Sequence, residues 1–175
     1  PDTTLPTSLV ATASLQQAVN ESDIVVVAVP TKAIRSVCQQ FVPFMREEKL
    51  FVHVSKGIEP DSLKRISELL AEEIPSTLRS DIVVLSGPSH AEEVVLQHPT
   101  TVTVACENMR AAERVQDAFM SSYFRVYTLE DVIGAEIGGA LKNVIALAAG
   151  AVDGLGYGDN AKAALITRGL AEISR

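Results

Sequence analysis

The chain has 175 residues, of which 47% are hydrophobic, and a formal net charge of −7 without any cluster of lysine and arginine. This composition supports a folded core and excludes a largely disordered chain, while the acidic balance argues against a nucleic-acid surface. Cys38 and Cys106 have no metal or redox spacing and no signal peptide is visible, so we expect a reduced, cytoplasmic setting. The chain begins without Met and ends inside a predicted helix, and we expect it to be an excerpt of a longer protein.

Apolar runs in the first half of the chain predict three buried strands of a parallel sheet, at residues 23–30, 49–55 and 81–85. Helices are predicted between these strands, at 31–45 and 60–74. Pro60 fits a first helical turn, where its missing N–H costs nothing. The apolar residues expected on one side of that helix are Leu63, Ile66, Leu69 and Leu70.

The pattern continues with a short helical segment at 90–96 and with strands at 100–105 and 124–128 around a helix at 108–122. Strands that alternate with helices predict an α/β fold, here part of a doubly wound, Rossmann-like parallel sheet with helices on both faces. After Asp131 the strand signals stop, and eight of the ten glycines fall between Gly134 and Gly169.

Two helices are therefore expected at the end of the chain, at 132–152 and 160–175, with Asp159 as the N-cap of the second. The domain boundary is placed near Leu129, with a dinucleotide-binding domain at 1–128 and the beginning of an all-α domain at 129–175. The glycines at 154, 156 and 158 follow a helix, whereas a dinucleotide-binding glycine loop follows a strand, so they are interpreted as a helix terminator and turn.

Lys142 lies in an almost entirely apolar run from Ile133 to Val152. Such a lysine must reach water, find a partner or have a lowered pKa, and the last of these suits a proton-transfer catalyst. The charges of Glu136 and Lys142 argue against a membrane span. Helical spacing puts Lys142 on a stripe of small residues that must face a backbone or a ligand. A snorkelling or salt-bridged lysine is an equally open interpretation.

The loops that follow the three strands are expected along one edge of the sheet, where ligands bind in open parallel sheets. The first loop ends in Pro30. The second carries Lys56, and the third, Ser86 to Ser89, offers hydroxyls and N–H groups before a helix, as a cradle for an anion. The second and third loops can also be interpreted as ordinary turns without a binding role. His90 borders the third loop and could line the site, although packing is its expected role, and the histidines have no metal-ligand spacing.

Four segments, taken together, resemble the NAD(P)-dependent sn-glycerol-3-phosphate dehydrogenases of the bacterial type. They are residues 55–59 (SKGIE), 85–89 (LSGPS) with Ala91 and Glu93 after it, 131–134 (DVIG), and 138–144 (GGALKNV) running on through 154–160 to 168–170. Each motif is weak alone, but their order and spacing are similar to the family's from end to end.

The resemblance implies reversible hydride transfer between NAD or NADP and C2 of glycerol 3-phosphate or dihydroxyacetone phosphate, which would supply glycerol phosphate for phospholipid synthesis. It implies that Lys142 is the catalytic acid/base and that Lys56 contacts both substrate and cofactor. Gly87, Ser89 and Asn143 are the further substrate-binding candidates. Pro30 and Ala91 are the further cofactor-binding candidates.

The same resemblance places the family's first strand and its glycine-rich loop before Pro1, and an arginine and an aspartate of the site after Arg175. It suggests a homodimer as the full-length protein. The main alternative is a 3-hydroxyacid or 6-phosphogluconate-type dehydrogenase, which pairs the same two kinds of domain. A second alternative is a nucleotide-sensing domain without catalysis.

Overall fold

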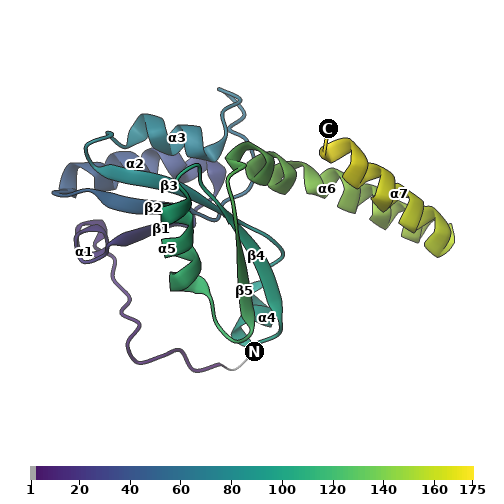
Figure 1. The fold of residues 1–175 in the computed structure, drawn as a ribbon, viewed down its shortest axis with the longest axis horizontal. Helices are drawn as coiled ribbons and strands as arrows, with labels where there is room; N and C mark the ends of the chain where they lie inside the picture. Colours follow the sequence, from purple (N-terminus) through teal and green to yellow (C-terminus); the bar gives the residue numbers. More distant parts are fainter. Residues whose placement is uncertain (1–2) are drawn as a thin grey trace.

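The computed structural model describes residues 3–175, which form a five-stranded sheet with helices on both sides (Figure 1). The strands follow the chain order across the sheet: β1 (Ile24–Val27), β2 (Lys49–His53), β3 (Arg79–Ser86), β4 (Thr100–Ala105) and β5 (Phe124–Leu129). β1, β2 and β3 are parallel, β4 is antiparallel to β3, and β5 is parallel to β4. The predicted α/β, mostly parallel sheet is confirmed, with one antiparallel junction.

The helices and short 3₁₀ segments of the described chain are α1 (Leu15–Asn20), η1 (Thr31–Ala33), α2 (Ile34–Phe41), η2 (Val42–Phe44), α3 (Ile66–Glu73), α4 (Ala91–Val95), α5 (Met109–Phe119), α6 (Val132–Gly154) and α7 (Gly158–Ile173). Side chains on successive residues of β2 point to opposite faces of the sheet. Phe51 packs with Ile34 and Leu69 on the α2 and α3 side. Val52 packs with Val115 on the α5 side. The sheet is therefore covered on both faces, as a doubly wound fold requires.

The helix predicted at 60–74 begins six residues later, at Ile66. Residues 58–65 form a loop closed by a bridge between Ile58 and Arg65. Leu63 has a φ of 57° and is 76% exposed, so it does not belong to the apolar helix side. Pro60 was therefore wrongly placed in a helical turn. The loop is favoured because an ion-pair network holds it, which periodicity does not reveal.

Two smaller expectations were also wrong. Asp159 is not an N-cap but lies in the first turn of α7, which begins at Gly158. The chain can enter that helix early because Gly156 and Gly158 both take positive φ values, 71° and 78°. The first strand is not buried on both faces, since Val26 is 44% exposed. β1 forms the edge of the sheet among the described strands.

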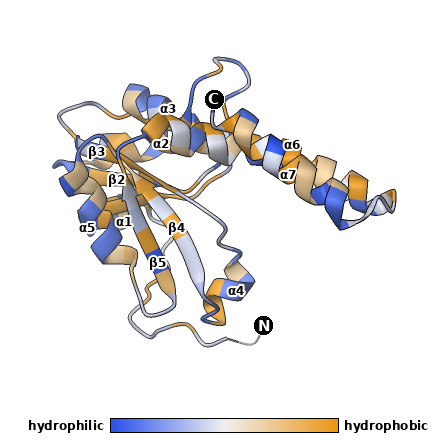
Figure 2. Ribbon diagram, turned by 45° about the vertical axis from the view of Figure 1, so that its right-hand side comes forward, coloured by the Kyte–Doolittle hydropathy of each residue, from blue (hydrophilic) through white to orange (hydrophobic). Residues whose placement is uncertain are grey.

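α6 and α7 pack along each other and extend away from the sheet (Figure 1). Figure 2 shows hydrophobic residues along both helices, and many of them are exposed, Leu147 by 78% and Val144 by 64%. α6 is long and apolar enough, by length and composition, to cross a membrane, although it carries Glu136 and Lys142. The placement of the domain boundary near Leu129 stays a prediction.

Candidate active site

The loops that follow β1, β2 and β3 meet at one edge of the sheet, as expected for parallel strands. The hydroxyl of Ser55 donates a hydrogen bond of 2.6 Å to the carbonyl oxygen of Val29. The hydroxyl of Thr31 donates one of 3.1 Å to the carbonyl oxygen of Lys56. Lys56 in turn reaches the third loop, where its Nζ donates a hydrogen bond of 3.2 Å to the carbonyl oxygen of Gly87.

Gly87 is required at the start of the third loop. Its φ is +155°, and a Cβ built there would lie 2.8 Å from the Cα of Val102 on the neighbouring strand. Because real Cβ atoms do not approach a backbone that closely, only glycine lets β3 turn here against β4. The turn brings Ser86 and Ser89 to the side of the sheet that α6 covers.

α6 is fixed over this edge at its N-terminal end. The carboxylate of Asp131 accepts a hydrogen bond of 2.7 Å from the N–H of Gly134, which caps the helix. Two turns on, a Cβ at Gly139 would lie 2.9 Å from Oγ of Ser86, so the helix backbone rests directly on the end of β3. The small residues of α6 thus serve close packing on the sheet edge.

A cavity of about 600 Å³ lies between α6 and the strand ends. Four of the predicted site residues line it, namely Lys56, Gly87, Ser89 and Lys142. The stripe of small residues predicted on α6 faces it through Ala135, Gly138 and Gly139. His90 lines the cavity too, so the packing role expected for it was wrong.

Asn143 and the cofactor-binding candidates Ala91 and Pro30 do not line this cavity. Asn143 follows Lys142 and accepts a hydrogen bond of 3.1 Å from its Nζ. Ala91 lines a second cavity of about 410 Å³ on the α4 and α5 side, and Lys56 borders both cavities. Pro30 is exposed at the end of β1, beside the loop that carries Lys56.

The two lysines differ in exposure, and that of Lys142 fits the snorkelling alternative left open by its sequence. Lys142 is exposed on α6, so it reaches water as well as the cavity. Partial burial of the Lys56 ammonium lowers the pKa of Lys56 below its ordinary value. Repulsion from the charge of Lys142 lowers this pKa further.

The third loop is a weaker anion cradle than its sequence indicates. The helix that follows it, α4, has only five residues, and its first turn carries Glu92 and Glu93. These carboxylates oppose the partial positive charge that a helix N-terminus presents to an anion. Both side chains are exposed.

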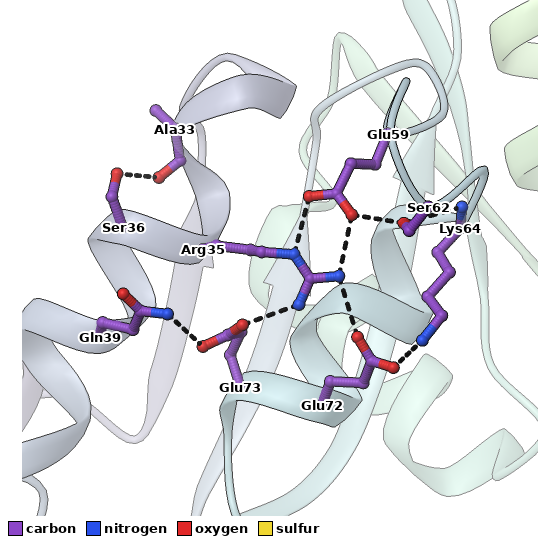
Figure 3. Close-up of polar contacts among 9 residues, drawn as sticks. All are labelled: Ala33, Arg35, Ser36, Gln39, Glu59, Ser62, Lys64, Glu72 and Glu73. Atoms are coloured by element: carbon purple, nitrogen blue, oxygen red, sulfur yellow. Dashed lines mark hydrogen bonds and ion pairs between the residues drawn. The ribbon is translucent and has the colours of Figure 1, made fainter.

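An ion-pair network organises the loop that follows Lys56 and Gly57 (Figure 3). Arg35 of α2 donates to both carboxylate oxygens of Glu59, at 2.8 Å each. It also donates to Glu73 at 2.7 Å and to Glu72 at 2.9 Å, both on α3. The guanidinium lowers the pKa of Glu59 to about 2, with a further hydrogen bond from Ser62. The network fixes the loop on α2 and α3.

Sequence reasoning missed a cluster beneath the cavity, formed by Glu136 of α6 with Arg65, Ser67 and His53. The sequence does contain one signal for it, because a glutamate inside an apolar helix must either reach water or find cationic and polar partners. Those partners lie far away along the chain, and only the fold brings them to Glu136.

A strand-end cavity covered by a long helix, on a sheet with helices on both faces, defines the class of this chain: a Rossmann-type nucleotide-binding fold that continues into a helical part. The sequence model described as the N-terminus of NAD-dependent glycerol-3-phosphate dehydrogenase matches residues 1–112, and the model described as the C-terminus of the same enzyme matches residues 131–175. The chain belongs to the NAD-dependent glycerol-3-phosphate dehydrogenase family.

Individual relatives agree with this assignment. Glycerol-3-phosphate dehydrogenase [NAD(P)+] of Lysinibacillus sphaericus is 69% identical over all 175 residues, which cover 52% of that protein. The enzyme of the same name from Bacillus subtilis is 67% identical over the same residues, or 51% of its length. The crystal structure of glycerol-3-phosphate dehydrogenase from Coxiella burnetii is similar over the whole of this chain, with a TM-score of 0.88 and 34% sequence identity. The match covers 53% of the Coxiella burnetii chain. The chain thus spans about half the length of the relatives that it matches.

Proposed function

We propose that the full-length protein containing this chain is an NAD(P)-dependent glycerol-3-phosphate dehydrogenase, which interconverts sn-glycerol 3-phosphate and dihydroxyacetone phosphate. One observation carries the proposal within the chain itself. Lys56, from the end of β2, and Lys142, from α6, line the same cavity together with Gly87 and Ser89. Two ammonium groups at one cavity in an otherwise acidic chain suit a small anionic substrate whose oxygen changes its protonation.

The cavity residues have separate roles in the proposal. Lys142 gives a proton to the C2 oxygen when the ketone is reduced, and its neutral amine takes that proton back when the alcohol is oxidised. Lys56 stabilises the negative charge that develops on the same oxygen. Ser89 and Asn143 donate hydrogen bonds to substrate oxygens, and Gly87 faces the substrate with its backbone in the cavity lining.

The cofactor is proposed to lie against Lys56, Ala91 and Pro30, and the residues present fit such a group. The second cavity is lined mainly by apolar side chains, including Phe119 and Phe124, and it shares Lys56, Gly87 and Ser89 with the first. Such a lining suits a planar ring whose reactive face must exclude water. When bound, NADH or NADPH supplies a hydride for C2.

Further proposals concern the setting of the full-length protein. We expect a cytoplasmic homodimer that supplies glycerol phosphate for phospholipid synthesis, without a nucleic-acid partner and without insertion into a membrane. In a soluble dimer, the exposed hydrophobic residues of α6 and α7 are covered by protein. Size-exclusion chromatography with light scattering tests the dimer. A monomer, or a protein recovered only with the membrane fraction, would contradict these expectations.

The activity is tested with the full-length protein, by following the oxidation of NADH and of NADPH when dihydroxyacetone phosphate is added. We expect turnover with dihydroxyacetone phosphate and none with 3-hydroxyacid or 6-phosphogluconate substrates in the oxidative direction. Turnover of those substrates alone would assign the protein to the related dehydrogenases. Binding of NAD(P)H without turnover of any of them would favour a nucleotide sensor.

A further inference from the structure

Glu136 is a charged residue of α6 that is buried, with 7% of its surface exposed, and the proposed reaction does not use it. Its carboxylate has partners on two other elements. Arg65 donates from Nη1 to Oε2 at 2.7 Å. Ser67 donates from its backbone N–H to Oε1 at 2.8 Å and from its hydroxyl to Oε2 at 2.6 Å. Nε2 of His53, at the end of β2, lies 3.2 Å from Oε1.

The carboxylate of Glu136 closes the N-terminus of α3. Ser67 is the second residue of that helix, so its N–H has no acceptor within the helix and needs one from outside. A negative charge at this end is also favoured by the helix dipole. With the charge of Arg65 added, these contacts offset the cost of burying the carboxylate. Burial alone would raise the pKa of Glu136, but the contacts with His53 and Ser67 outweigh it and lower the pKa to about 2.

This cluster lies directly beneath the proposed active site. A small cavity of about 10 Å³ separates the two, and its lining includes His53 and Glu136 from below and Lys56 and Ser86 from above. His53 is three residues before Lys56 on the same strand end. Glu136 is six residues before Lys142, which is about 9 Å along a helix axis. His53 and Lys56 therefore share the end of β2, and Glu136 and Lys142 share α6, while Arg65 and Ser67 add contacts from the start of α3.

The position of Lys142 depends on the rotation of α6 about its axis. Gly139 presses on Ser86 and sets how closely the helix approaches the sheet, but a contact through a glycine leaves the helix free to turn. Glu136 is bonded to α3 through both carboxylate oxygens, so it sets the rotation. A turn of the helix would carry Lys142 out of the cavity, away from Lys56.

We propose that Glu136 is a positioning residue, which holds α6 on α3 at the rotation that directs Lys142 into the cavity opposite Lys56. This inference rests on the proposed function, in which Lys142 carries the C2 proton. Misplacement of a catalytic group by about 1 Å can cost on the order of 100-fold in rate. The loss should fall on kcat, since the nucleotide side of the cavity does not depend on α6.

The test compares Glu136→Gln with wild type in the full-length protein, with Glu113→Gln as the matched control, because Glu113 is exposed on α5. For Glu136→Gln we expect kcat with dihydroxyacetone phosphate to fall about 10- to 100-fold. The dissociation constant of NADPH, measured by fluorescence, should stay close to that of wild type. Ser67→Ala should lower kcat less, and Ser67→Thr, which keeps the hydroxyl, should restore it.

A second readout needs no activity. A short amine-reactive cross-linker should join Lys56 to Lys142 in wild type, with a yield that falls in Glu136→Gln and persists in Glu113→Gln. If wild type has no activity, the proposed function fails and the cross-link alone decides the positioning. A folded Glu136→Gln protein with unchanged kcat and unchanged cross-link yield overturns the inference. If Glu136→Gln does not fold, the same two readouts on Ser67→Ala decide in its place.

Discussion

The ammonium group of Lys56 donates a hydrogen bond to the carbonyl oxygen of Gly87, with 3.2 Å between the two atoms. This bond ties the loop after β2 to the loop after β3 and holds the side chain of Lys56 between two adjoining cavities. It also leaves the ammonium close enough to Lys142 for the two charges to repel each other. The lowered pKa of Lys56 is the measurable sign of this arrangement.

Replacing Lys142 by Met should raise the pKa of Lys56, because one of the two causes of its lowering is removed. The pKa should remain below the ordinary lysine value of about 10.4, because partial burial is the larger cause and stays in place. The pH dependence of amine labelling at Lys56, followed by mass spectrometry, measures this pKa. Lys162→Met is the control, since Lys162 pairs with Asp153 outside the cavity.

The same pKa has a consequence for stability. Between the lowered value in the folded protein and about 10.4, the unfolded chain binds a proton that the folded chain does not. The free energy of unfolding therefore rises as the pH rises through this window. The gain is lost again as the pH falls back to the lowered pKa of folded Lys56.

The labelling experiment also has an outcome that would contradict the proximity of the two lysines, namely a Lys56 pKa that is the same in wild type and in Lys142→Met.

Lys142→Ala in the full-length protein should lower kcat by about 10²- to 10⁴-fold, the usual contribution of a general acid/base. The fold should remain intact, because Lys142 is exposed and its side chain bonds only to Asn143 among the described residues. Steady-state kinetics and denaturant unfolding measure the two effects. Lys162→Ala should leave kcat unchanged, and a loss below about tenfold for Lys142→Ala would make Lys142 a structural residue.

Much of this site could be predicted from the sequence because its rules are local. Apolar runs mark the strands, and parallel strands place Lys56 and Gly87 at one edge whatever the details of packing. Helical spacing puts Lys142 on the same stripe as Gly139. What the sequence could not give depends on contacts between distant segments. Glu136 could be interpreted only as an argument against a membrane span, since Arg65 and Ser67 become its partners through the fold.

The start of α3 was missed for the same reason. Residues 60–65 have an acceptable helical pattern, but Arg35 holds Glu59 and Leu63 takes a positive φ, so the loop persists to Arg65. Tertiary contacts override a local preference of less than about 1 kcal/mol per residue. The exposure of Lys142 was likewise beyond the sequence, because an apolar run around a lysine does not tell which side of the helix faces protein.

Gly139→Ala should destabilise the protein and lower kcat. The added Cβ would lie 2.9 Å from Oγ of Ser86, so the hydroxyl or the helix must move, at a cost of about 1–3 kcal/mol that a helix-propensity gain of up to about 1 kcal/mol partly offsets. Gly138→Ala is the matched control, since a Cβ there has no atom within 4 Å among the described residues. It should be neutral or stabilise the helix by up to about 1 kcal/mol. Denaturant unfolding of both variants measures the difference.

Ser86→Ala should rescue the stability of Gly139→Ala, because it removes the atom that the new Cβ meets. A double-mutant cycle over the two positions should give a coupling of about 0.5–3 kcal/mol, as for residues in direct contact. If the effects of the two substitutions on stability simply add, contact with Ser86 is not the reason why alanine at position 139 destabilises the protein.

The ion pairs of Glu136 should make stability depend on pH in the acid range. Its pKa is lowered from 4.5 to about 2, so the stability it contributes is fully present above pH 4.5 and is lost as the pH falls toward 2. At about 1.4 kcal/mol per pKa unit, the contribution is on the order of 3 kcal/mol.

The difference in unfolding free energy between wild type and Glu136→Gln should therefore be constant from neutral pH down to about 5 and narrow below it. Glu113→Gln, at an exposed site, should differ from wild type by the same small amount throughout. A gap between wild type and Glu136→Gln that does not change with pH would mean that the carboxylate of Glu136 is not held as an anion by its contacts with His53 and Ser67.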